Sequence, residues 1–190
     1  YKPIKPEVTE KKKKHPIKTI KILCSNKYFI LITLAFAIIY TSLGLTGGSR
    51  IYYAKYVLGN EMINSTMTLF NYIPTILTIM LIPIFAKKFG KIKALFVGFL
   101  FYGAGLILEI AGPVNLPMIY GGLVLQGIGH AALYSCLFAI VGDVVDYSEW
   151  KDGIREEGLT YSVTSFGQKI GTGLGTAALG WILAAGNYNG

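Results

Sequence analysis

The sequence predicts an all-α membrane protein, and three observations support this fold class. Of the 190 residues, 53% are hydrophobic and only 15% are charged. The apolar residues gather in blocks of about 20, which is the length that a helix needs to cross a bilayer. The links between these blocks alternate between lysine-rich and lysine-poor, as the positive-inside rule describes for membrane helices joined by short loops. We therefore expect a bundle of transmembrane helices.

Five transmembrane helices are expected, in antiparallel order. Three of the apolar blocks contain no Asp, Glu, Lys or Arg, whereas the third contains Glu109 and the fifth contains Lys169. Pro74 and Pro83 lie within the second block and predict a kink, because proline lacks an N–H group and clashes with the preceding turn. The five predicted spans are residues 28–48, 63–86, 94–112, 116–142 and 159–185.

Residues 1–27 precede the first block and are rich in lysine and proline. We expect them to form a flexible basic linker in the cytoplasm, since lysines also fill the second link, and Lys151 and Arg155 lie in the fourth. This distribution accounts for the net charge of +8 without a nucleic-acid partner and leaves the bilayer as the expected surroundings. A signal peptide does not fit, because a full-length apolar span follows the basic start. The chain begins at Tyr1 rather than Met, so we expect a segment of a longer protein.

Enzyme chemistry has little support in this sequence. Cys24 lies at a basic membrane boundary and Cys136 lies inside a span, so we expect neither a disulfide nor a metal site. The sequence contains no phosphate-binding loop, no nucleophile–base pattern and no redox motif. We therefore expect no cofactor and no catalytic activity.

The last predicted span carries an arc of polar side chains. At about 100° per residue, seven polar residues fall on one side of the helix: Tyr161, Thr164, Ser165, Gln168, Lys169, Thr172 and Thr176. Gly167, Gly171 and Gly175 follow one edge of this arc and favour close packing on another helix. The arc itself is predicted to face a wet cavity. Lys169 is a functional candidate, because a charge within a membrane helix needs a polar surrounding or a partner. Alternatively, the hydroxyls bond to carbonyls of their own helix and the lysine pairs with an acid elsewhere.

The fourth predicted span places Gln126, His130 and Tyr134 on one helical face, at positions i, i+4 and i+8. Tyr134 is expected either to contact a sugar ring or to serve in helix packing. His130 has no metal-ligand partner at helical spacing, so we expect a hydrogen bond in a cavity instead. Glu109 is expected to reach the membrane interface, and Asn71 is expected to support helix packing.

A charged connector follows the fourth span. Asp143 and Asp146 share a face if that helix continues beyond residue 142, and two acids there favour basic partners from other helix ends. Together with Glu149, Lys151 and Arg155, they are predicted to form a cytoplasmic gate. Asp152, Glu156 and Glu157 are expected to lie in a solvated loop.

Four stretches carry a family resemblance: 25–29 (SNKYF), 52–59 (YYAKYVLG), 142–151 (GDVVDYSEWK), and 161–163 (YSV) followed by Gln168 and Lys169. With these residues the chain resembles the glycoside-pentoside-hexuronide:cation symporter family of the major facilitator superfamily. The resemblance implies a partial major facilitator fold, in which the five spans are helices 7–11 of 12. Residues 1–27 then link the two halves, residues 28–190 belong to the C-terminal half, and the N-terminal half and helix 12 lie outside this chain.

The resemblance also implies a function and a site. The family moves a sugar, glycoside or hexuronide together with sodium or a proton across the cell membrane. Its sugar-site positions fall on Tyr134, Thr164, Ser165 and Lys169, and we add the neighbouring Gln168 and His130. The coupling cation is expected to be bound mainly by the N-terminal half. Two other functions stay open: transport of another small polar solute, and a membrane sensor or scaffold that does not transport.

Overall fold

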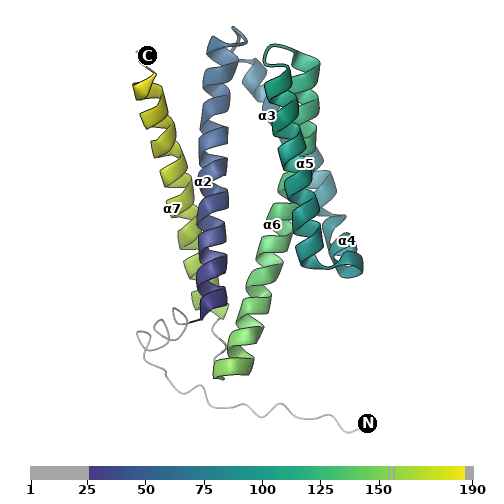
Figure 1. Ribbon diagram of the computed structural model, residues 1–190, viewed down its shortest axis with the longest axis vertical. Helices are drawn as coiled ribbons and strands as arrows, with labels where there is room; N and C mark the ends of the chain where they lie inside the picture. The colour runs from purple at the N-terminus through teal and green to yellow at the C-terminus, as the bar shows by residue number, and fades with distance from the viewer. Residues whose placement is uncertain (1–25, 154, 156, 187–190) are drawn as a thin grey trace.

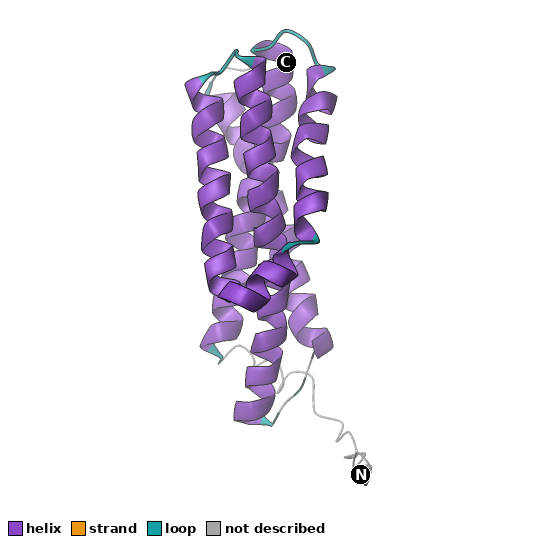
Figure 2. Cartoon of the chain, turned by 90° about the vertical axis from the view of Figure 1, so that its right-hand side faces the viewer, coloured by secondary structure: helices purple, strands orange, loops and turns teal. Residues whose placement is uncertain are grey.

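The computed structural model describes residues 26–153, 155 and 157–186, and these residues form six helices and no strand. Figure 1 shows them as an elongated bundle, and Figure 2 shows that short links join them. The helices are α2 (Lys27–Tyr56), α3 (Ile63–Ile79), α4 (Ile82–Phe89), α5 (Lys91–Ala111), α6 (Leu116–Asp152) and α7 (Glu157–Ala185). The predicted linker at 1–27 lies almost wholly outside the described residues.

Two groups of helices make up the bundle. α2 packs along α7, while α5 and α3 both pack along α6. In Figure 1 the pair formed by α2 (purple to blue) and α7 (yellow) lies beside the group of α3, α5 and α6. α2 meets α6 through a core that contains Phe36, Leu137 and Val141. This core lies toward the end of the bundle where α2 begins, so the two groups are held together at that end.

The second predicted span is broken. α3 ends at Ile79, α4 begins at Ile82, and the two axes differ in direction by 52°. Pro83 lies in the first turn of α4, and its ring would clash with the carbonyl of Ile79 in a continuous helix. Pro74 remains inside α3. The kink that the sequence predicts is therefore confirmed, and it lies at Pro83.

Two helices run beyond the ends of the predicted spans. α2 continues to Tyr56 rather than ending near residue 48. α6 continues to Asp152, so the first part of the connector is helix rather than a separate link. Val144 and Val145 in this extension are buried, and α6 ends where Gly153 adopts a left-handed conformation with φ of 62°.

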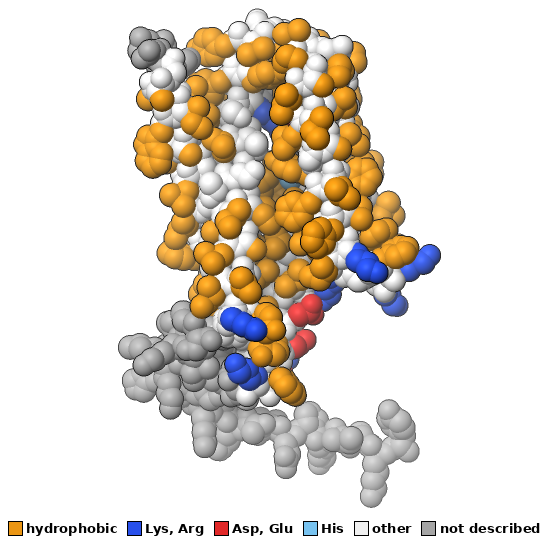
Figure 3. Space-filling model, in the orientation of Figure 1, with side chains coloured by type: hydrophobic (Ala, Val, Ile, Leu, Met, Phe, Trp, Pro, Cys, Tyr) orange, Lys and Arg blue, Asp and Glu red, His pale blue; other side chains and the backbone are white. Residues whose placement is uncertain are grey.

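Within the described residues, three helices are long and apolar enough to cross a membrane, namely α2, α5 and α6, and the bent pair α3–α4 would make a fourth. α7 has 29 residues, but its glycines, threonines and Lys169 make it less apolar. The count of five spans therefore stays a prediction. Figure 3 shows hydrophobic side chains over most of the visible helix surface, with most visible charges gathered toward one end.

Candidate functional site

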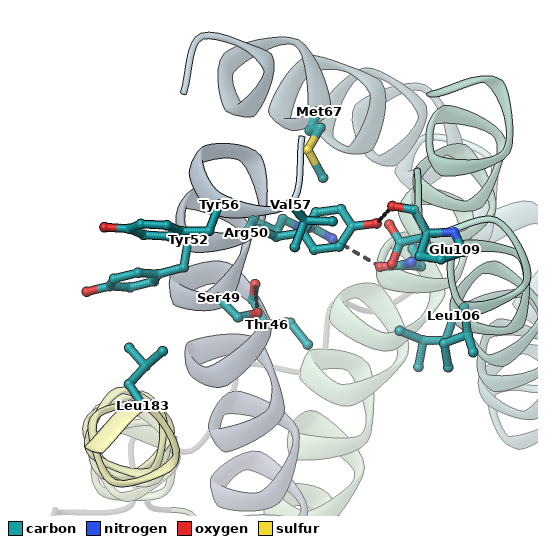
Figure 4. A pocket seen from close by; sticks show the side chains of 14 residues that line it. Thr46, Ser49, Arg50, Tyr52, Tyr56, Val57, Met67, Leu106, Glu109 and Leu183 are labelled. Carbon is teal, nitrogen blue, oxygen red and sulfur yellow. Dashed lines mark hydrogen bonds between the residues drawn. The ribbon is translucent and has the colours of Figure 1, made fainter. Parts of the chain in front are cut away.

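A cavity of about 700 Å³ opens between the two groups of helices, near the end of the bundle where α2 ends. Figure 4 shows side chains entering it from both groups. Arg50 and Tyr53 come from α2, Leu106 and Glu109 from α5, and Gln126 from α6. The cavity lies beside a second apolar core, in which Ala54 of α2 packs with Met67 of α3 and with Ile119 and Leu123 of α6.

Three of these side chains form a polar group within the cavity. Arg50 donates a hydrogen bond from Nη2 to Gln126 Oε1 at 3.0 Å. Figure 4 shows Arg50 and Glu109 extending toward one another from opposite walls. Gln126 is only 1% exposed. Within the part of the chain that the structure describes, Gln126 Nε2 and Glu109 Oε1 are buried and have no hydrogen-bond partner.

The face of α6 that contains Gln126 continues away from the cavity as a polar and aromatic column. The His130 ring stacks on Tyr134 with centroids 5.7 Å apart, and Tyr102 of α5 lies 5.0 Å from His130. Tyr40 of α2 lies 6.3 Å from Tyr134. The predicted shared face of Gln126, His130 and Tyr134 is therefore confirmed. Among the described residues, His130 Nε2 and the Tyr102 hydroxyl are buried without a hydrogen-bond partner.

The glycine edge of α7 packs on α2, as the sequence predicts. A Cβ atom at Gly171 would lie 2.4 Å from the carbonyl oxygen of Ala37, and one at Gly175 would lie 2.2 Å from that of Thr41. Such distances leave no room for a side chain. The absence of side chains on this edge of α7 lets the two helix backbones touch, which fixes α2 as a wall of the cavity.

The polar arc of α7 divides into buried and exposed parts. Thr164 is fully buried, and its hydroxyl donates to the Tyr161 carbonyl at 2.9 Å. The hydroxyls of Thr172 and Thr176 donate to carbonyls one turn earlier, as the alternative interpretation proposed. Gln168 is half-buried and Ser165 is exposed.

Lys169 is exposed on α7. Its ammonium forms no ion pair with any residue in the described ranges. Among those residues, no hydrogen bond, ion pair or ring contact joins the α7 arc to the α6 column. The structure therefore does not bring Lys169 and Tyr134 together directly.

Four of the predicted gate residues, Asp143, Asp146, Glu149 and Arg155, form ion pairs. Together with Lys91 of α5, they define what we call the charged end. Lys91 Nζ of α5 lies 2.6 Å from Asp143 Oδ1 of α6. Arg155 contacts Asp146 at 3.1 Å and Glu149 at 2.5 Å, and it also reaches Glu157 at the start of α7. Hydrogen bonds with Glu149 and Glu157 raise the pKa of Arg155. The Lys151 ammonium lies 6.0 Å from the Tyr147 ring.

A buried contact fixes the start of α2 at the same end. The Asn26 side chain accepts a hydrogen bond from the Tyr28 backbone N–H, and it donates through Nδ2 to Ser148 Oγ of α6 at 3.0 Å. The Tyr28 and Tyr147 rings meet edge to face, with centroids 4.9 Å apart. Asn26 is thus both the helix cap of α2 and a link to α6.

Residues 2–190 match the sequence profile of the family described as MFS/sugar transport protein. The chain belongs to this family. It is similar to an isoprimeverose transporter of Lactiplantibacillus pentosus, with 29% identity over 96% of the chain. It is also similar to a glucuronide carrier protein homolog of Escherichia coli strain K12, with 27% identity over 90%. A raffinose carrier protein of Pediococcus pentosaceus shares 26% over 85%.

The chain spans only part of these relatives, covering 38% of each of the first two and 25% of the raffinose carrier. No solved structure matches the chain. Membership in this family of sugar transport proteins, together with the apolar helices, makes the chain a part of a multi-pass membrane protein.

Sequence reasoning missed two residues of the cavity. Arg50 lies beyond the predicted end of the first span at residue 48, but α2 continues to Tyr56 and contains it. Glu109 was expected to reach the interface, whereas its side chain is half-buried and lines the cavity. The rule that singles out Lys169, a lone charge in an apolar span, applies equally to Glu109. That signal was present in the sequence.

Proposed function

We propose that the protein to which this chain belongs carries a sugar, glycoside or hexuronide across the cell membrane together with sodium or a proton. The observation that supports this most strongly is the polar and aromatic column of α6, which runs from the cavity into an otherwise apolar bundle. Sugars are bound by aromatic faces together with polar groups that both donate and accept hydrogen bonds. The relatives named above carry an oligosaccharide, a disaccharide or a glucuronide in their names.

We assign two surfaces to the substrate. Tyr134 and His130 of α6, which do not line the cavity described above, contact the sugar from one side of a site between the two halves of the transporter. Ser165, Gln168 and Lys169 of α7, with Thr164 behind them, form the second surface. Lys169 is exposed here and needs a carboxylate inside a membrane. In this proposal the N-terminal half supplies that carboxylate and most of the cation site.

The proposed topology has a cytoplasmic N-terminus. The lysines that follow α3 lie toward the end of the bundle where α2 begins and α6 ends (Figure 3), and the positive-inside rule assigns such an end to the cytoplasm. The charged end then acts as the cytoplasmic gate, with its ion pairs made in one arrangement of the two halves and rearranged in the other. Transport follows from rocking one half against the other around a site near the midplane.

The test is uptake by the full-length transporter in proteoliposomes, with counterflow of labelled glycosides and an imposed sodium or proton gradient. We expect exchange of at least one glycoside and gradient-driven accumulation. Binding without exchange would instead favour a sensor or scaffold. Exchange of other polar solutes alone would favour a different substrate class.

Lys169→Ala gives the residue-level prediction. The change leaves the partner carboxylate without its cation, so we expect gradient-driven uptake to fall by about 100-fold or more while the protein still inserts. Lys88→Ala, on the exposed end of α4, is the matched control and should leave uptake unchanged. Uptake of Lys169→Ala with unaltered cation dependence would contradict the assigned role.

A further inference from the structure

The mouth of the cavity contains polar groups that the sugar site assigned above does not use. Arg50, Glu109 and Gln126 come from three different helices and meet beside the cavity. Gln126 Oε1 already accepts from Arg50, which leaves the amide Nε2 as a donor. Glu109 Oε1 is an acceptor, and neither atom makes a hydrogen bond of normal geometry among the described residues, although the two side chains also interact with each other.

Burying polar atoms that lack hydrogen-bond partners lowers the stability of a membrane protein. A buried donor and a buried acceptor that both lack partners lose their hydration without a compensating bond. Two apolar side chains in the same place would avoid this cost. The arrangement is understandable if the missing partners arrive with a ligand. Since all three side chains line one open cavity of about 700 Å³, a sugar-sized ligand has room to supply them.

We propose that Arg50, Glu109 and Gln126 form a subsite that binds two neighbouring hydroxyls of an uncharged sugar. One hydroxyl donates to Glu109 Oε1 and the next accepts from Gln126 Nε2. Arg50, which is held by Gln126 at 3.0 Å, supplies further N–H donors. This inference rests on the proposed sugar transport and adds a statement about which part of the substrate is recognised.

The charges of the subsite decide between an uncharged and an anionic sugar. Arg50 and Glu109 carry opposite charges, so their sum is close to zero. A carboxylate or sulfonate on the ligand only accepts hydrogen bonds, so it cannot satisfy Glu109 and would lie beside a like charge. A hydroxyl both donates and accepts, which matches the two unpaired atoms. The geometry therefore selects an uncharged diol at this position.

Tyr53 closes one side of the subsite. Its hydroxyl donates to the carbonyl of Pro113, in the link between α5 and α6. Because the hydroxyl is occupied, Tyr53 offers its ring rather than a polar group. Leu106 and Met67 add apolar surface, so the subsite combines a polar pair with an apolar wall.

The experiment measures equilibrium binding to the full-length transporter of methyl glucopyranoside, methyl galactopyranoside, methyl xylopyranoside, their monodeoxy analogues and methyl glucopyranosiduronate. The variants are Glu109→Gln, which keeps the shape, and Arg50→Lys, which keeps the charge. Glu61→Gln is the matched control, because Glu61 lies at the same end but pairs with Lys55 on the surface. Counterflow of the same sugars by the unmodified transporter tests the proposed function separately.

We expect Glu109→Gln to weaken binding of the uncharged glycoside by about tenfold or more and to shift the preference toward the uronate, since the subsite then has net positive charge. A monodeoxy sugar that binds weakly to the unmodified transporter should lose nothing further in Glu109→Gln. Arg50→Lys should also weaken binding, because the planar fork is lost. Glu61→Gln should change none of these values.

Three results would overturn the inference. If the unmodified transporter exchanges an uncharged glycoside but Glu109→Gln leaves both affinity and preference unchanged, Arg50 and Glu109 form only a structural charge pair and the proposed function stands. A preference of the unmodified transporter for the uronate would contradict the inference in the same way. If the unmodified transporter exchanges none of these sugars, the proposed function and the inference both fail.

Discussion

The two ends of this bundle treat polar groups in opposite ways. At the charged end, Asn26 is bonded to Ser148, Lys91 to Asp143, and Arg155 to three carboxylates. At the cavity end, polar atoms of Glu109, Gln126 and His130 are buried without partners among the described residues. Paired groups close a structure, whereas unpaired buried groups in a cavity are available to a ligand. Apolar cores pack the helices at both ends, so the difference in polar groups indicates an ion-paired end and a binding region at the other.

The largest expected effect tests whether the apolar core at the charged end holds α2 against α6. Phe36 is fully buried between α2 and α6, against Leu137 and Val141. Phe36→Ala should leave a cavity and lower the stability of the folded protein by about 3–5 kcal/mol. Thermal unfolding in detergent measures this. Phe96→Ala, at a side chain that is 65% exposed, is the control and should change little. Equal effects of the two changes would mean that the core between α2 and α6 does not hold the bundle.

Asn26→Ala gives the next effect. It removes the cap of α2 and leaves Ser148 Oγ buried without its donor. We expect a loss of about 1–3 kcal/mol, visible as a lower unfolding temperature. Ser148→Ala should cost less, because the cap remains. If Ser148→Ala proved as harmful as Asn26→Ala, the cap would contribute nothing and the cross-link alone would matter.

In the α6 column, replacing a polar side chain should keep or raise the stability of the folded protein instead of lowering it. His130 is buried with Nε2 unpaired, and its ring stacks between Tyr102 and Tyr134. His130→Phe keeps the ring and removes the unpaired nitrogen, so stability should stay equal or rise by about 1 kcal/mol. Sugar binding should weaken in the same variant. Unfolding temperature and equilibrium binding measured together check this. A destabilised His130→Phe would show that the column is structural.

Much of this fold follows from the sequence, because lipid imposes strong rules. Apolar length predicts the helices, Pro83 predicts the break, and the glycine series of α7 predicts its close contact with α2. The helix ends are less predictable. Gly47 and Gly48 each cost a helix about 1 kcal/mol relative to alanine, yet α2 continues through them to Tyr56.

The site is only partly predictable for a related reason. One helical face is a local property, so Gln126, His130 and Tyr134 are found from their spacing. The meeting of Arg50, Glu109 and Gln126 depends on how three helices pack, and no spacing in the sequence encodes it. The same limit applies to Lys91 and Asp143, which are far apart in the sequence and become an ion pair only through the packing of α5 on α6.

Protection of the cavity by sugar tests the central claim most directly. Ser49 lines the cavity and is half-buried, whereas Ser162 is exposed on α7. In a full-length transporter with Cys24→Ser and Cys136→Ala, and with any cysteines outside this chain replaced, single cysteines at these positions can be alkylated with and without a bound uncharged glycoside. We predict that the sugar slows alkylation of Ser49→Cys by about fivefold or more and leaves Ser162→Cys unchanged. Equal rates at Ser49→Cys with and without saturating sugar would contradict the claim that this cavity binds the substrate.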